Sequence, residues 1–237
     1  MAARQDAQEA DVPTICKPCE ARQGGLCSVF NARQLAELAK ASSRHEILAG
    51  TELSDDGTYS NLLSGVVKLT RNLSDGRQQI LGFHFAPDFL GRPFKAKKSI
   101  KAQALTNVTL CSFPGTVIDR MINETPELGR RLLKHTLNEL DDARDWMAAL
   151  GRKTASEKVA SFLLMVARNM DPAHHPQSSI SFDLPLTRAD IADFLGLTIE
   201  TVSREFSRLR SDGAIRIANK RHISLASTAQ LEQRCGD

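Results

Sequence analysis

Three of the five cysteines of this chain lie within twelve residues, in the run CKPCEARQGGLC, at Cys16, Cys19 and Cys27. A single buried cysteine behaves as a small hydrophobic side chain, but three cysteines in a polar segment have no apolar face to join. The C-x2-C spacing lets two thiolates reach one centre, and the loop with Gly24 and Gly25 can bring the third cysteine to it. The spacing therefore predicts a metal or iron–sulfur site.

A fourth ligand is expected because iron–sulfur clusters usually take four thiolates. Cys111, the one later internal cysteine, is the candidate. Four thiolates also suit a tetrahedral zinc ion, so a structural zinc site is the alternative for the same residues. Cys235, near the end of the chain, has no evident partner, and we expect a free thiol in a disordered tail.

The composition is that of an ordinary soluble globular protein. The 237 residues suit two modest domains, with 41% hydrophobic and 25% charged residues. The N-terminal run MAARQDAQEADVP lacks the apolar stretch of a secretory signal, and no apolar run is long enough to cross a bilayer. We therefore expect a cytoplasmic protein with no membrane partner, whose thiols stay reduced.

The basic charge is gathered toward the C-terminal end of the chain. The net charge of +3 is too small by itself to indicate a nucleic acid partner. Residues 187–225, however, contain seven Lys and Arg against five Asp and Glu, and five of the seven basic residues follow Glu205. The distribution of charge is therefore more informative than its total.

Residues from about Leu48 to Phe113 form short apolar runs broken by turn signals, such as LLSGVVKLT and RQQILGFHFAPDFLG. Asp75-Gly76 between two such runs is a hairpin signal. Several short strands at this spacing predict a small antiparallel β-roll, assigned to residues 31–120 after a cysteine arm of residues 1–30.

From Pro126 the pattern is that of a helix of about thirty residues, ending near Thr154. Apolar residues recur at steps of three and four along one face: Leu133, Leu137, Leu140, Ala143, Met147 and Leu150. Because this length is unusual for a globular helix, we expect residues 121–154 to be a dimerisation helix and the protein a homodimer. The alternative is an amphipathic helix that lies on its own domain. A further helix is expected from Ser156 to Met170.

The segment LTRADIADFLGLTIETVSREFSRLR predicts two short helices joined by a tight turn. Thr187, with Asp190 three residues later, suggests a capping box; Gly196 ends the first helix, and Thr198 can cap the second. The residues expected to face inward are Ile191, Ala192, Leu195, Ile199, Val202, Phe206 and Leu209. Such a pair is a helix-turn-helix, whose second helix lies in the major groove of DNA.

The polar face of the second helix carries side chains that can read bases. Arg204 can fork to guanine O6 and N7, Glu200 can accept from cytosine N4, and Ser203 can approach either partner or a thymine methyl group. The following run, AIRIANKRHISL, predicts a β-hairpin wing, which completes a winged helix-turn-helix domain of residues 155–230. The residues assigned to phosphate contacts are Thr187, Thr198, Ser207, Lys220 and Arg221.

These motifs resemble the CRP/FNR superfamily of bacterial transcription regulators, and within it the FNR branch of oxygen-responsive iron–sulfur regulators. The resemblance runs from Cys16 to about Leu225. Its most specific pieces are the cysteine triplet, GFHFAPDFLG at 82–91, AQALTNVTLC at 102–111 and LGLTIETVSR at 195–204. It implies an α+β fold, with an N-terminal antiparallel β-roll of the cyclic-nucleotide-binding, jelly-roll type, a long dimerisation helix and a C-terminal winged helix-turn-helix.

The resemblance also implies the ligands of a [4Fe–4S] cluster. In the family, three N-terminal cysteines and one from the roll hold it, which correspond to Cys16, Cys19, Cys27 and Cys111. Oxygen converts the cluster, frees the arm and weakens dimer pairing. The intact form would activate anaerobic or microaerobic genes.

For DNA, the family's E-x-x-S-R motif, here Glu200, Ser203 and Arg204, reads a TTGAT half-site, and the dimer reads double-stranded TTGAT-N4-ATCAA. RNA polymerase is a further implied partner, and the Asn72–Arg77 turn is one candidate contact. We also hypothesise that exposed aspartates of the long helix, at 141, 142 and 145, weaken dimer pairing by like-charge repulsion; the alternative is that they only solvate the helix.

Two features depart from the best-known pattern. Seven residues rather than five separate Cys19 from Cys27, as in alphaproteobacterial members. The cyclic-nucleotide branch uses a Gly-Glu pair in the roll, whereas GRPFKAKKSIKAQAL has no such Glu, so no cyclic nucleotide is expected. The alternative function is a CRP/FNR-type regulator with structural zinc or no cluster. An enzyme is disfavoured, since the chain has no Gly-rich phosphate loop and no HExxH motif.

Overall fold

The computed structural model describes residues 12–54, 57–91, 100–172, 175 and 177–236. Within them the chain forms two compact units. One comprises the residues up to Thr70 together with Phe83–Leu140, and the other comprises Arg71–Gly82 together with the residues from Asp141 onward. The helix α5, Pro126–Arg152, contributes to both units. Among the described residues, no helix is long and apolar enough to span a lipid bilayer.

Antiparallel strands form the core of the first unit. One sheet has the order β1-β7-β2-β5, and another has the order β4-β3-β6. The strands are β1 Ser43–Ile47, β2 Thr58–Ser64, β3 Val66–Asn72, β4 Gln78–Phe85, β5 Phe89–Leu90, β6 Lys101–Ala104 and β7 Val108–Pro114. The expected β-roll is confirmed, although its first strand begins at Ser43 rather than near Leu48.

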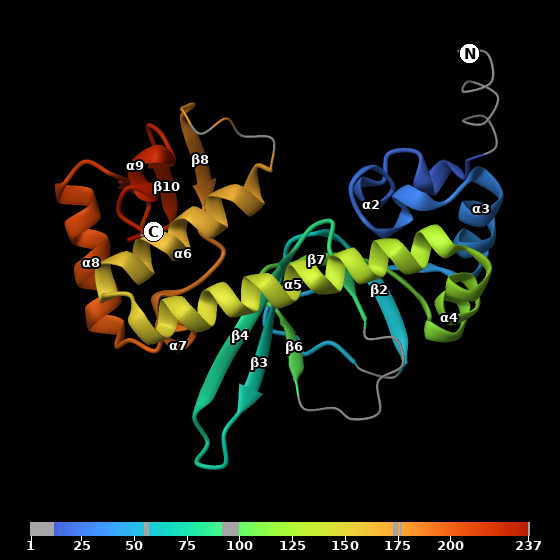
Figure 1. Cartoon of the computed structure of the whole chain (residues 1–237), viewed down its shortest axis with the longest axis horizontal. Helices are drawn as coiled ribbons and strands as arrows, with labels where there is room; N and C mark the ends of the chain where they lie inside the picture. Colours follow the sequence, from blue (N-terminus) through green and yellow to red (C-terminus); the bar gives the residue numbers. More distant parts are fainter. Residues whose placement is uncertain (1–11, 55–56, 92–99, 173–174, 176, 237) are drawn as a thin grey trace. The chain divides into compact units, whose positions relative to one another are not determined.

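Short helices lie beside the strands β2 and β7, as Figure 1 shows for α2 and α3. They are the 3₁₀ turn η1 Thr14–Cys16, α2 Glu20–Gln23, the 3₁₀ turn η2 Leu26–Val29, α3 Ala32–Ala41 and, after β7, α4 Gly115–Glu124. The α3 helix begins at a capping box in which Asn31 and Gln34 satisfy each other's backbone N–H groups.

The cysteine arm is not a wholly polar segment, and the expectation that its cysteines have no apolar face to join is wrong. Ala21, Leu26 and Cys27 are buried in one hydrophobic cluster with Leu35 and Phe113. The short helical turns make this possible, because they direct a few apolar side chains toward the core while the polar ones stay in water.

Gly25 allows the arm to approach the rest of the unit closely. A β-carbon at this position would lie 2.8 Å from the carbonyl oxygen of Pro87 and 2.9 Å from the Cα of Ala21. Any larger residue would push the arm outward at the residue pair that precedes Cys27.

The second unit carries a helix-turn-helix with a wing. Its elements are α6 Ala155–Met170, β8 Ile180–Asp183, α7 Arg188–Leu195, α8 Ile199–Ser211, β9 Arg216–Ala218, β10 His222–Leu225 and α9 Ala229–Glu232. The wing sheet has the order β8-β10-β9, and Figure 1 shows it grouped with α6 and α8. The aromatic rings of Trp146 and Phe162 pack on Phe194, with centroids 4.6 and 6.0 Å away. The expected winged helix-turn-helix is confirmed.

Two expectations for this unit are wrong in detail. Ile199 does not face inward but is 47% exposed, because it is the first residue of α8 and lies beyond the packed part of the helix. The residues around Cys235 are not a disordered tail, since they follow α9, and Cys235 is buried with its thiol donating to the carbonyl oxygen of Leu231 at 3.1 Å. Among the described residues Cys235 forms no disulfide, which agrees with the expectation for its thiol.

Candidate functional sites: a four-cysteine pocket and an exposed helix face

The four cysteines expected to be ligands line one pocket. Cys16 ends η1, Cys19 is the N-cap of α2, Cys27 lies in η2, and Cys111 lies on β7. The pocket has a volume of about 420 Å³, counting the part that opens to solvent. Its wall also includes apolar and polar side chains from the arm, α3 and the first sheet, among them Ile15, Arg22, Leu35, Ser42, Arg44 and Asn61.

The strand register places two polar side chains beside Cys111. Arg44 on β1 and Asn61 on β2 are both paired with Cys111 on β7. Directly opposite residues of antiparallel strands share a face of the sheet, so Arg44, Cys111 and Asn61 form a row across it. Asn61 also reaches the arm, because its amide Nδ2 donates to the sulfur of Cys27 at 3.3 Å.

The protein environment keeps the thiols of Cys16, Cys27 and Cys111 protonated at neutral pH, because it raises their pKa values. Burial, and then the proximity of the other cysteines, raises the pKa of Cys27 to about 12. Burial also raises the pKa of Cys16 and of Cys111, and the charge of Arg44 opposes this for both. A metal binds the thiolate form, so occupation of this pocket would release protons.

The pocket does not converge on a single point. Within the described part of the chain, no three His, Cys, Asp or Glu side chains are placed to hold one metal ion. A tetrahedral zinc site needs sulfurs about 2.3 Å from the ion, and therefore close to one another.

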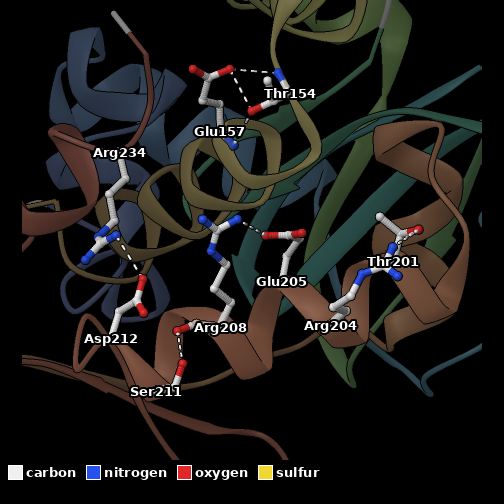
Figure 2. A network of polar contacts seen from close by, with 9 residues as sticks. All are labelled: Thr154, Glu157, Thr201, Arg204, Glu205, Arg208, Ser211, Asp212 and Arg234. Atoms are coloured by element: carbon white, nitrogen blue, oxygen red, sulfur yellow. Dashed lines mark hydrogen bonds and ion pairs between the residues drawn. The ribbon is translucent and has the colours of Figure 1, made fainter.

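The base-reading residues expected from the sequence lie together on one exposed face of α8. Glu200, Ser203 and Arg204 are exposed, and Ser207 continues the same face. Backbone N–H groups at the helix start and the hydroxyl of Thr198 lower the pKa of Glu200, so it is an ionised acceptor at neutral pH. The guanidinium of Arg204 donates a long hydrogen bond of 3.3 Å to the hydroxyl of Thr201 (Figure 2), and the side chain is exposed.

The opposite face of α8 is held by apolar and charged contacts. The guanidinium of Arg188 lies 3.4 Å from the ring centre of Phe206, a cation–π contact, and burial lowers the pKa of Arg188 to about 10. The buried carboxylate of Glu205 lies 4.0 Å from the guanidinium of Arg208, which Figure 2 shows turned toward it. These contacts fix the rotation of α8 about its axis.

The candidate phosphate contacts are spread over three elements. Lys220 and Arg221 are exposed at the turn of the wing, where Asn219 and Lys220 have positive φ angles of 48° and 64°. Such a turn is typical of two-residue hairpins. Thr187 and Thr198 are the N-caps of α7 and α8, with hydroxyls that accept from the helix backbone.

Most large apolar side chains of the α5 stripe are exposed to solvent in the single chain. Leu133, Leu137, Leu140 and Met147 are 60, 48, 43 and 73% exposed, and Leu150 is half-buried. A row of large apolar side chains in water indicates a surface that another molecule covers.

Sequence reasoning did not find Arg44, Asn61 or Ser42 near the cysteines. Arg44 and Asn61 lie far from the arm in sequence and become neighbours of Cys111 only through the strand register. Ser42, at the end of α3, lines the pocket, and its hydroxyl opposes the rise in the pKa of Cys111 that burial causes. Sequence reasoning also missed a polar cluster around His84, whose buried imidazole has Nδ1 3.3 Å from Asp88 and Nε2 3.8 Å from Glu139.

Comparison with known proteins gives the same division of the chain. A model of the cyclic nucleotide-binding domain matches residues 44–125, and a model of the Crp-like helix-turn-helix domain matches residues 157–234. A probable transcriptional activator of Rhizobium leguminosarum bv. viciae is 50% identical over 98% of this chain and 97% of its own length. The transcriptional activator protein FnrL of Cereibacter sphaeroides is 39% identical over 96% of this chain and 95% of its own.

Among solved structures, FixK2 from Bradyrhizobium japonicum aligns with a TM-score of 0.74 and 30% identity, covering 83% of this chain and 98% of that one. The β-roll, the winged helix-turn-helix and these relatives define a DNA-binding transcriptional activator. The chain belongs to the Crp/FNR family, among its alphaproteobacterial FNR-type members.

Proposed function

We propose that this activator responds to oxygen and binds a TTGAT-N4-ATCAA-type palindrome as a homodimer while its four pocket cysteines hold a [4Fe–4S] cluster. The observation that carries the proposal is the pocket itself. Cys111 comes from a central strand and the other three cysteines come from the N-terminal arm, yet all four line one space.

The placement of the described cysteines supports a cluster rather than a single zinc ion. In a four-iron cluster each thiolate binds a different iron atom, so the four sulfurs stand farther apart than around one ion. Because the cysteines are not placed to hold one ion, a zinc site would require the arm to close inward.

The charges around the pocket suit an anionic group. Four thiolates carry more negative charge than the irons and sulfides neutralise, and the pocket wall includes Arg22 and Arg44. Both guanidinium groups lower the pKa of Cys16, and Arg44 also lowers that of Cys111. They would stabilise the thiolates that an occupied pocket requires.

Bound there, a cluster would supply an oxygen-sensitive link between the arm and the roll. The arm in turn contacts α5: Leu128 belongs to the hydrophobic cluster of the arm, and the guanidinium of Arg131 donates to the carbonyl oxygen of Gly24. Release of the arm would remove both contacts from the first turns of α5. The exposed stripe further along α5 is the proposed dimer seam.

The dimer places two α8 helices on two half-sites, about one helical turn of DNA apart. Arg204, Glu200 and Ser203 would read the bases, and Lys220 and Arg221 would bind phosphates. The Asn72–Arg77 turn is exposed, with an ion pair of 2.7 Å between Asp75 and Arg77, and is one candidate contact for RNA polymerase. The absence of a cyclic nucleotide effector stays a prediction, because residues 92–99 lie outside the described residues.

The test is to purify the full chain without air, measure iron, sulfide and zinc, and measure binding to the TTGAT palindrome before and after exposure to air. The proposal expects a brown protein with about four irons per chain, whose affinity for the palindrome falls in air. Colourless protein with one zinc, or equal DNA binding in both conditions, would contradict it.

Cys111→Ser and Cys235→Ala form a matched pair for this test. Cys111→Ser removes one pocket ligand and should lose iron and oxygen-dependent DNA binding. Cys235→Ala removes a buried thiol in the other unit and should retain both.

A further inference from the structure

Asn61 is the most deeply buried polar side chain in the wall of the cysteine pocket. It lies on β2 and is 1% exposed. Its amide nitrogen donates to the sulfur of Cys27 at 3.3 Å. Its amide oxygen is also buried and has no hydrogen-bond partner among the residues that the structure describes.

A buried amide with one unsatisfied end reduces the stability of the folded protein. The neighbouring position shows how the same strands avoid this loss. Ser60 and Ser112, one residue earlier on β2 and one later on β7, satisfy each other through a hydroxyl pair of 2.7 Å. An apolar side chain at position 61 would fill the space without an orphan oxygen, so packing alone does not explain Asn61.

Cys27 is the cysteine with the greatest need of a donor. It is the most buried of the four, and water cannot solvate its thiolate. The charged groups of the pocket act on the other sulfurs: Arg22 and Arg44 on Cys16, and Arg44 on Cys111. Among the described residues, the side-chain hydrogen bond to the Cys27 sulfur comes from Asn61.

We propose that Asn61 is a positioning residue for the cluster, whose amide N–H holds the Cys27 sulfur in place and stabilises it as a ligand. The inference rests on the proposed function. Hydrogen bonds to the ligand sulfurs of iron–sulfur clusters tune the potential and stability of the cluster, and groups that orient metal ligands commonly change metal affinity about 10- to 100-fold when removed.

This role predicts opposite effects of one substitution: it should not lower the Tm of the apoprotein, but it should weaken iron retention by the loaded protein. In the apoprotein, Asn61→Leu removes a buried orphan oxygen and keeps the volume, so Tm should stay the same or rise. In the loaded protein the same change removes the donor to Cys27, so iron should be lost more easily. A purely structural residue would shift both in the same direction.

The experiment compares the wild-type chain with Asn61→Leu, Asn61→Ala and Ser60→Ala, each reconstituted without air. Two quantities are measured: the rate at which an iron chelator extracts iron anaerobically, and the Tm of the apoprotein. We expect Asn61→Leu and Asn61→Ala to lose iron about 10-fold faster than the wild type, with no fall in apoprotein Tm for Asn61→Leu. Ser60→Ala should lose iron at the wild-type rate, because its hydroxyl pairs with that of Ser112.

Extraction at the wild-type rate from both Asn61 variants would overturn the inference while leaving the proposed function intact. A clear fall in the apoprotein Tm of Asn61→Leu, together with faster iron loss, would make Asn61 a structural residue. That result would also overturn the inference. A wild-type chain that takes up no iron would instead refute the proposed function, and this inference with it.

Discussion

The guanidinium of Arg131 on α5 donates a hydrogen bond to the carbonyl oxygen of Gly24, in the loop that joins Cys19 to Cys27. This bond ties the segment between two pocket cysteines to the helix that carries the exposed apolar stripe. Neither partner is a cysteine or a member of that stripe. The contact is therefore a place where the state of the arm can bias α5 without changing the pocket or the seam.

We expect Arg131→Met to leave the iron content unchanged and to weaken the loaded dimer. A hydrogen bond of this kind contributes about 1 kcal/mol, so the dimer dissociation constant should rise about fivefold. Analytical ultracentrifugation of the loaded protein measures it. Arg130→Met is the matched control, since Arg130 pairs with Glu127 on its own helix. Equal dissociation constants for the two variants would show that the Arg131 contact does not act on pairing.

Titration of the His135 imidazole should make the folding stability of the first unit depend on pH. Its contact with Glu139, 3.6 Å from Nδ1, raises the pKa of His135 above its ordinary value, and Asp88 adds to this while burial and Arg131 oppose it. A raised folded-state pKa stabilises the protein fully below the unfolded value of about 6.5, and this stabilisation is lost as the pH rises through the folded-state pKa. His135→Gln should therefore lower Tm at about pH 6 and have little effect at about pH 9. A Tm difference that is the same at both pH values would contradict this assignment.

Much of the fold follows from the sequence, because local signals specify it. Thr187 with Asp190, Gly196 and Thr198 form the caps and the left-handed turn that the helix-turn-helix requires, and the structure has all of them, with Gly196 at φ 63°. The long helix ends at Arg152, two residues before the expected Thr154. Turn and cap chemistry acts within a few residues, so a single sequence contains it.

The wall of the cysteine pocket does not follow from the sequence in the same way. Asn61 and Arg44 meet Cys111 through strand pairing across tens of residues, and a shift of register by one residue would turn each to the other face of the sheet. The burial of Ala21 and Leu26 was missed for a related reason: each apolar run in the arm is too short to show a period.

Substitution of Arg204 and substitution of Lys220 should impair DNA binding in different ways. Arg204 is on the exposed face of α8, and loss of a bidentate base contact costs about 1–3 kcal/mol at one base pair. Arg204→Ala should therefore lose discrimination at one position of each half-site. Lys220→Ala should weaken binding to all sequences alike and reduce the slope of log affinity against log salt by about one per chain. Titration of single-base variants of the palindrome at several salt concentrations measures both. Normal binding of Arg204→Ala to TTGAT would show that the groove assignment is wrong.

The exposed leucines of α5 should determine association. Leu137→Glu places a charge in the middle of the stripe, and burial of a leucine contributes about 1.5–3 kcal/mol. The dimer dissociation constant should rise at least about 10-fold, and DNA affinity should fall with it. Leu48→Glu is the control, since Leu48 is 70% exposed and lies outside α5. A monomeric wild type, or an unchanged dimer in Leu137→Glu, would exclude this face as the seam.

The aspartates beside the stripe test whether charge repulsion makes pairing marginal in air. Asp141 is offset by an ion pair of 3.2 Å with Arg144, so we expect Asp145→Ala to strengthen the aerobic dimer more than Asp141→Ala does. The gain should shrink in about 1 M salt, where the screening length is about 3 Å. Glu46→Ala, on β1, changes the net charge equally and should have no effect on pairing. If no aspartate of the set 141, 142 and 145 gives a tighter aerobic dimer or tighter DNA binding on replacement by alanine, these carboxylates only solvate the helix. The proposed oxygen response would then act through the contacts of the arm with α5.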